Sequence, residues 1–224
     1  LKVLPFKTAA VLVILFTVLL CLSPAFSNEP LLFVGDDDFP PYSFETADGI
    51  KGIDAELIRE MARRMNIKIT IRLVPWKRLI MMTENGTCDG SFSLFHTKKR
   101  EQFAFYAFSQ PIHISSYPLF YQKAHPFQFN RVSDLYGKTI GVNRGFTIGD
   151  EFDLAVKQGK IKANIENEVD KNILLTASGR IDGFTNNRDV TLYKLKHKPR
   201  LRQFKDDILH TDNSISKLRA AYLV

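Results

Sequence analysis

Residues 31–94 of the sequence, LLFVGDDDFPPYSFETADGIKGIDAELIREMARRMNIKITIRLVPWKRLIMMTENGTCDGSFSL, alternate between patterns typical of strands and of helices. Residues 31–34 are an apolar run that ends at a glycine and three aspartates. This pattern predicts a buried strand that enters a loop over residues 36–52. Apolar residues then repeat at helical spacing after Asp54, which can cap a helix.

The segments that follow continue the same order. Alternating apolar residues predict a strand over residues 68–74. A second helix is expected to begin at Pro75 and Trp76, and residues 88–94 are expected to form the next strand. Strands that alternate with helices in this way are typical of an α/β layer with a largely parallel sheet.

This order of elements then recurs further along the chain. The motif GTCDGSF at residues 86–92 is echoed by GRIDGF at residues 179–184, and in both a helix ends on glycine before a short strand. We therefore predict an α/β protein of two similar lobes with a mainly parallel sheet in each and a ligand cleft between them. The second set consists of strands at 138–142, 162–166 and 181–184 and helices at 147–158 and 170–178.

The first 27 residues have the features of a signal peptide. Lys2 and Lys7 give a positively charged segment before an apolar run over residues 9–22. The small residues Ala25 and Ser27 stand at positions −3 and −1 of a cleavage site after Ser27. The run is short for a membrane span, although a membrane anchor and a buried helix are the alternatives. We expect an exported, periplasmic protein whose folded part begins at residue 28.

The composition of the 224-residue chain excludes several classes of protein. Hydrophobic residues make up 45% and charged residues 25%, which fits neither a disordered chain nor a polytopic membrane protein. Only Cys88 lies beyond residue 27, and the five histidines are dispersed, so we expect no disulfide, no metal and no cofactor.

The net charge of +7 raises the question of a nucleic-acid partner. The basic residues do not interleave with aromatic residues along one element, and the densest basic run, residues 194–202, comes late in the second lobe. We therefore expect no nucleic-acid partner. We also expect a monomer whose partner is a small-molecule ligand.

Two strand-to-helix turns have the residues of an anion site. Thr97 is a good N-cap, and the guanidinium of Arg100 can bind a carboxylate through two parallel hydrogen bonds. A solvated basic turn is the alternative. Residues 143–147 form a similar turn in the second lobe, so the two turns predict a carboxylate or phosphate clamp shared by both lobes. No Ser-His-Asp set and no glycine-rich phosphate loop is present, which argues against an enzyme.

Aromatic residues stand near the same turns. Phe39 and Tyr42 follow the first strand, and Trp76, the only tryptophan, begins a helix. Each can contribute an aromatic wall to a ligand site, and packing in the core is the alternative for each.

These motifs, taken in order, are similar to those of the family 3 extracellular solute-binding proteins, which include the periplasmic amino-acid receptors of ABC importers. The resemblance covers nearly all of the chain beyond residue 27. It is carried by Asp38-Phe-Pro-Pro-Tyr-Ser-Phe44, Gly52-Ile-Asp54, Val74-Pro-Trp-Lys-Arg-Leu79, Gly86-Thr-Cys-Asp-Gly90, Thr97-Lys-Lys-Arg100, Asp134-Leu-Tyr-Gly-Lys-Thr-Ile-Gly-Val142 and Gly179-Arg-Ile-Asp182.

The resemblance implies two α/β lobes, joined by crossover strands, that close on a small ligand without chemistry. The first lobe would comprise residues 28–111 and the second residues 112–218, with residues 219–224 returning to the first lobe as a strand. Further helices follow this strand in the family, so we expect a truncated reading frame or a fragment that is prone to aggregation. An ABC permease or a membrane sensor would be the protein partner.

The resemblance also implies roles for individual residues. Arg100 matches the arginine that grips the ligand α-carboxylate, with Ser93 and Thr147 near it, and Phe39 matches an aromatic that covers the ligand. Tyr42 and Trp76 lie in neighbouring cleft segments. Asn186 stands where the amino-acid receptors commonly place an acid that holds the α-ammonium, and an amide cannot supply that charge. Phe95 and Phe146 add bulk where small polar residues are frequent.

Two other functions are compatible with the same fold. One is a dehydratase, for which Asp36, Asp38 and Glu45 are the nearest candidate acids or bases. The other is a sensory binding module whose signal a partner protein would carry.

Overall fold

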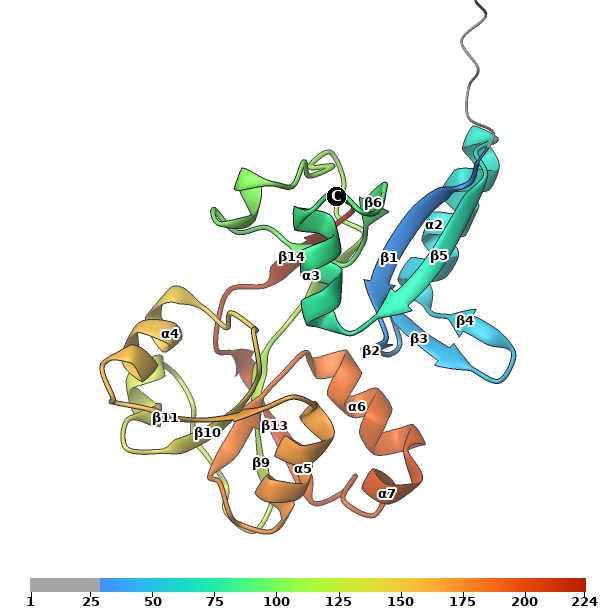
Figure 1. Cartoon of the computed structure of the whole chain (residues 1–224). Helices are drawn as coiled ribbons and strands as arrows, with labels where there is room; N and C mark the ends of the chain where they lie inside the picture. The colour runs from blue at the N-terminus through green and yellow to red at the C-terminus, as the bar shows by residue number, and fades with distance from the viewer. Residues whose placement is uncertain (1–28) are drawn as a thin grey trace, which may run out of the picture.

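Strand β1 (Leu31–Asp36) is the centre of the first lobe in the computed structural model, which describes residues 29–224. It lies between β5 (Ile69–Val74) and β6 (Gly90–Ser91), and both neighbours run parallel to it. The signal peptide predicted at residues 1–27 lies outside the described residues. Figure 1 shows this lobe joined to a second one that contains the larger sheet.

Alternate residues of β1 bury their side chains against different helices. Phe33 packs in a cluster with Ile58 of α2 (Ile53–Met65), whereas Val34 packs with Leu79 of α3 (Trp76–Glu84). Since neighbouring residues of a strand point to opposite faces, the two helices cover the two faces of the sheet, as Figure 1 also shows.

The loop predicted over residues 36–52 contains a small antiparallel sheet. Its strands are β2 (Asp38–Phe39), β3 (Ser43–Thr46) and β4 (Gly49–Lys51). These strands are short and rich in turn residues, which is why the local pattern indicated only a loop.

The second lobe has a five-stranded sheet with the order β11-β10-β12-β9-β13. Only β9 runs against the other strands, because it enters directly from the first lobe. The strands are β9 (Pro118–Gln122), β10 (Thr139–Asn143), β11 (Lys162–Glu166), β12 (Gly183–Thr185) and β13 (Ile208–Ser214).

Helices cover both faces of this sheet. Phe152 of α4 (Asp150–Lys157) packs with Ile140 and Leu119, while Ile173 of α5 (Val169–Ala177) packs with Phe120 and Phe184. Helices α6 (Arg188–His197) and α7 (Pro199–Arg202) lie on the α5 side. The mixed α/β architecture predicted from the sequence is therefore confirmed.

The two lobes are joined by strands that lie side by side. Strands β7 (Leu94–Phe95), β14 (Arg219–Tyr222) and β8 (His113–Ser115) form an antiparallel sheet in the order β7-β14-β8. Beyond β14, Val224 exchanges two backbone hydrogen bonds with Ser91 of β6, at 2.7 and 2.8 Å.

Three local predictions differ from the structure. The strand predicted at residues 88–94 is divided into β6 and β7, because Ser93 adopts a left-handed conformation with φ of 66°. The helix predicted from Thr97 is only the 3₁₀ turn Arg100–Gln102, and the α4 helix begins at Asp150 rather than at Thr147.

Candidate functional site

A pocket lies between the two lobes, where the crossing strands bring their ends together. With the lobes in this arrangement the pocket is narrow: its cavity volume is about 20 Å³, which is roughly the space of one water molecule, and it opens to solvent on one side. Segments of the first lobe contribute Asp36, Phe39, Trp76, Ser93, Phe95 and Arg100, and the remaining walls are Tyr117, Phe146, Thr147 and Arg219.

Five of the seven residues predicted to bind ligand line this pocket. They are Phe39, Trp76, Ser93, Arg100 and Thr147. They come from separate segments of both lobes, so the crossover connection brings together residues that are far apart in the chain.

Tyr42 and Asn186 are not among the residues that line the pocket. The Tyr42 ring stacks on His113 with 4.0 Å between ring centroids, and its hydroxyl donates to the Asp189 carboxylate at 2.8 Å. Asn186 is buried, and its amide donates to the hydroxyl of Thr191 at 3.1 Å. Both side chains are thus engaged in contacts that support the cleft walls.

The guanidinium of Arg100 is held in a defined place. Its Nη1 donates to the backbone oxygen of Phe95 at 2.7 Å, and the group lies 5.1 Å from the centre of the Trp76 ring. Burial lowers the pKa of Arg100, and the nearby charge of Arg219 acts in the same direction. The group remains charged, because the ordinary pKa of arginine is far above neutral pH.

Arg219 also lines the pocket, and no sequence motif predicts it there. It is the first residue of β14, donates to the backbone oxygen of Thr147, and lies 4.4 Å from the centre of the Phe95 ring. Nothing in its neighbouring sequence marks it as a binding residue, since it reaches the pocket only because β14 pairs between β7 and β8.

Asp36 is the acidic residue that lines the pocket. Burial at the end of β1 raises its pKa to about 7, although the backbone N–H of Asp38 donates to it at 3.2 Å and opposes this shift. The side chain can therefore exist in either protonation state near neutral pH, and it can accept from an ammonium or donate to an oxygen.

Asp54 supports the pocket from behind and does not cap its helix. The N-cap position of α2 is Gly52, without a side-chain hydrogen bond. Asp54 is fully buried, and its Oδ2 accepts from the Ser93 hydroxyl at 2.5 Å and pairs with His113 Nδ1 at 2.8 Å. The cap prediction was wrong because these two partners, distant in sequence, compete for the carboxylate.

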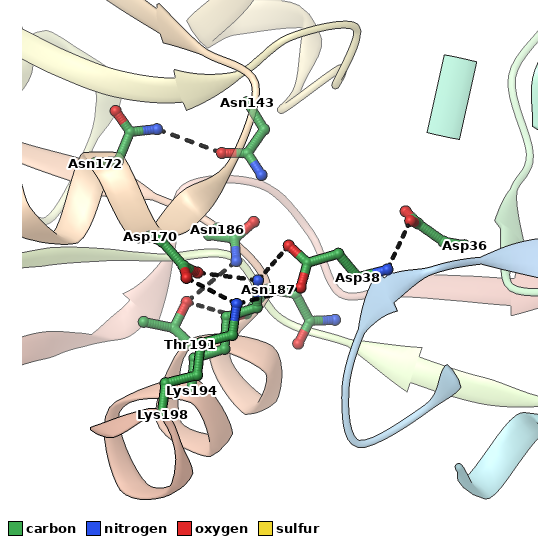
Figure 2. A network of polar contacts seen from close by, with 10 residues as sticks. All are labelled: Asp36, Asp38, Asn143, Asp170, Asn172, Asn186, Asn187, Thr191, Lys194 and Lys198. Carbon is green, nitrogen blue, oxygen red and sulfur yellow. Dashed lines mark hydrogen bonds and ion pairs between the residues drawn. The ribbon is translucent and has the colours of Figure 1, made fainter. Parts of the chain in front are cut away.

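A network of charged side chains joins the lobes beside the pocket (Figure 2). The ammonium of Lys194, on α6, is fully buried and donates to Asp38 of β2 and, at 3.1 Å, to Asp170 of α5. Lys198 pairs with the same two acids, at 2.7 Å from Asp170 and 3.6 Å from Asp38. Since β2 belongs to the first lobe, this network ties one lobe to the other.

Residues 29–224 contain no group of three or more His, Cys, Asp or Glu side chains placed to hold a metal ion. Within the same residues, no helix has the length and apolar character needed to cross a bilayer.

The sequence matches a family model over residues 31–215, that of the bacterial extracellular solute-binding proteins, family 3. The chain belongs to this family. Among curated proteins, a probable histidine-binding protein of Campylobacter jejuni is 25% identical over 75% of this chain and 63% of its own length. The L-cystine-binding protein TcyJ of Escherichia coli is 26% identical over 51% of this chain and 43% of its own length. The chain thus spans less than two thirds of the length of either relative.

Solved structures support the same fold. The arginine-bound form of a truncated ArgBP from T. maritima has a TM-score of 0.69 and 25% identity, covering 88% of this chain and 89% of that one. A histidine kinase sensor domain with similarity to periplasmic binding proteins has a TM-score of 0.73 at 20% identity, covering 87% of this chain and 81% of that one.

Proposed function

We propose that this family member is a periplasmic solute-binding protein that captures a small carboxylate-bearing solute, an amino acid or a related compound, by closure of the two lobes. The observation that carries the proposal is the guanidinium of Arg100 in a pocket between the lobes. Among residues 29–224, no carboxylate lies within ion-pair distance of it, so its charge is available to a ligand.

The walls of the pocket strengthen this interaction. Phe39, Trp76 and Phe146 place apolar surface beside the guanidinium, and an ion pair becomes stronger where such surface displaces water. Ser93 and Thr147 add hydroxyl groups that can bind the same carboxylate or a neighbouring polar group. Since Phe146 and Thr147 belong to the second lobe, ligand contacts on both sides would favour the closed arrangement.

The named relatives agree with an amino-acid ligand. Proteins described as binding histidine, cystine and arginine are similar in sequence or structure. Asp36 could hold an ammonium group, which would fill the role that the amide of Asn186 cannot.

The lobe boundaries, location and partners belong to the same proposal. We assign residues 28–111 to the first lobe and residues 112–218 to the second, and the pairing of β14 with β7 supports the return of residues 219–224 to the first. The ligand-bound monomer would dock on an ABC permease or a membrane sensor, in the periplasm. The family description as extracellular supports this location.

A thermal melt against a panel of amino acids and small carboxylates tests the proposal. A ligand that binds only the folded protein raises the melting temperature, by linkage. The shift should disappear in Arg100→Met, which retains an apolar side chain over Trp76, and persist in the control Arg78→Met, whose side chain is exposed on α3. An unchanged shift in the Arg100 variant would contradict the proposal.

A dehydratase is the second candidate function, because Asp36 lines the pocket with a pKa of about 7. A carboxyl group with this pKa can act as a general acid or base near neutral pH. Asp38 is engaged with Lys194 and Glu45 is exposed, so neither competes for this role. The test is turnover of a cyclohexadienyl acid, measured by absorbance. Turnover by the native protein that is lost in Asp36→Asn would establish the enzyme, whereas no turnover by the native protein would exclude that substrate class.

A further inference from the structure

Two guanidinium groups, not one, face the pocket. Arg100 is fixed over the Trp76 ring, and Arg219 is fixed over the Phe95 ring, 4.4 Å from its centre. Each group also donates to a backbone oxygen, Arg100 to Phe95 and Arg219 to Thr147. Because each guanidinium has five N–H donors, both retain donors for a ligand.

Neither charge is held in a direct ion pair by the described residues, although the charge of Asp153 acts on Arg219 from a greater distance and opposes the lowering of its pKa by burial. In residues 29–224, neither arginine has a carboxylate oxygen within 4.0 Å, although the chain forms such pairs elsewhere with exposed arginines such as Arg59 and Arg63. Burial lowers the pKa of both arginines, and Arg219 contributes to the shift at Arg100. Two half-buried cations at one pocket are costly unless an anion binds between them.

The single acidic side chain of the lining does not cancel this charge. Asp36 has a pKa of about 7, so near neutral pH it carries a charge only part of the time. The lining is therefore net positive in both protonation states of Asp36. It carries one excess positive charge when Asp36 is ionised and two when Asp36 is protonated.

We infer that the pocket is selective for a solute with two carboxylate groups, one bound by Arg100 and the other by Arg219. This inference rests on the proposed function and narrows its ligand class. Arg219 is then a residue that determines specificity, since a monocarboxylate needs only Arg100. A ligand with a cationic side chain would place a third positive charge beside the two guanidinium groups.

Two kinds of dicarboxylate share this chemistry. Aspartate and glutamate carry an ammonium group that could donate a hydrogen bond to Asp36, whereas succinate and glutarate have no such group. Tighter binding of the amino dicarboxylates, lost in Asp36→Asn, would identify an acidic amino acid. Equal or tighter binding of succinate or glutarate would identify a plain dicarboxylic acid.

Titration calorimetry of the purified protein with L-glutamate, L-aspartate, succinate, glutarate, L-alanine and L-arginine tests the inference. Loss of one charge-assisted contact predicts that Arg219→Met binds the preferred dicarboxylate roughly 10- to 100-fold more weakly, with little change for a monocarboxylate. Arg180→Met is the matched control, because its side chain is exposed and outside the pocket lining. Arg219→Lys, which keeps a charge at that place, should recover part of the affinity.

The outcomes separate this inference from the proposed function. Tighter binding of L-alanine or L-arginine than of every dicarboxylate would overturn the dicarboxylate inference and leave the proposed function standing. Equal dicarboxylate affinity in Arg219→Met and the native protein would also overturn it. No binding by any compound in the panel would count against both.

Discussion

Replacement of Lys194 by methionine tests the network that ties the lobes together. Lys194 is fully buried on α6, and its ammonium donates to Asp38 in the first lobe and to Asp170 in the second. Methionine fills most of the same volume without a charge, so the packing of α6 is largely retained. The substitution therefore removes the two ionic contacts and leaves the two carboxylates in place.

The expected loss of stability follows from the environment of the two acids. Removal of one member of a fully buried ion pair typically costs about 3–5 kcal/mol. Here the side chains of Asp38 and Asp170 are 39% and 22% exposed, and Lys198 still pairs with both. We therefore expect a smaller loss in the free energy of unfolding, about 1–3 kcal/mol, which corresponds to about 2–12 °C in the melting temperature for a chain of this size.

Thermal and urea unfolding of Lys194→Met, Asp38→Asn and the double variant measure this effect. The two substitutions should be coupled by at least about 0.5 kcal/mol, because they remove the same contact. Lys196→Met is the matched control, since it lies on the same helix with an exposed side chain. A loss in Lys194→Met no larger than in the control, or additive effects of the two substitutions, would refute the reasoning.

Two further predictions concern buried acids at the pocket. The folded state favours the protonated form of Asp36, so the free energy of unfolding should fall as pH rises from about 4 to about 7, by up to about 4 kcal/mol. Urea unfolding between pH 5 and pH 8 should show a shallower fall in Asp36→Asn, and an unchanged slope would contradict this. Asp54→Ala should lower the free energy of unfolding by about 2–4 kcal/mol, since Ser93 and His113 lose their shared partner. A loss below about 0.5 kcal/mol in chemical denaturation would count against that role.

The architecture could be predicted from local patterns. Strands such as β1, β5 and β10 are apolar or alternating runs bounded by turn residues, and α2 and α3 repeat their apolar residues at helical spacing. The ordered motifs then indicated the family, which the match over residues 31–215 confirms. These features are readable because a strand or helix is set largely by residues within a few positions of one another.

The pocket was predictable only in part. Arg100 and Thr147 were predicted from motifs in the turns after strands, and Ser93 from the family resemblance. Arg219 carries no local signal and enters the pocket through β14. Tyr42 was predicted as a cleft residue from its neighbours, and its side chain instead stacks on His113. The direction in which a side chain points depends on the distant elements that pack beside it, and the local sequence pattern does not specify these elements.

The acids and lysines illustrate the same division. Asp54 lies where a helix cap is expected, yet its carboxylate binds Ser93 and His113, which are 39 and 59 positions away in the sequence. Tertiary packing therefore directs the side chain into the core. Lys194 belongs to a basic run of ordinary surface composition, and it is buried because Asp38, 156 positions away, lies opposite it across the cleft. The sequence alone determined the main alternation of strands and helices, since this depends on short-range periodicity. Only the tertiary structure decided which charges meet, because a charge is buried only where distant chain segments supply its partner.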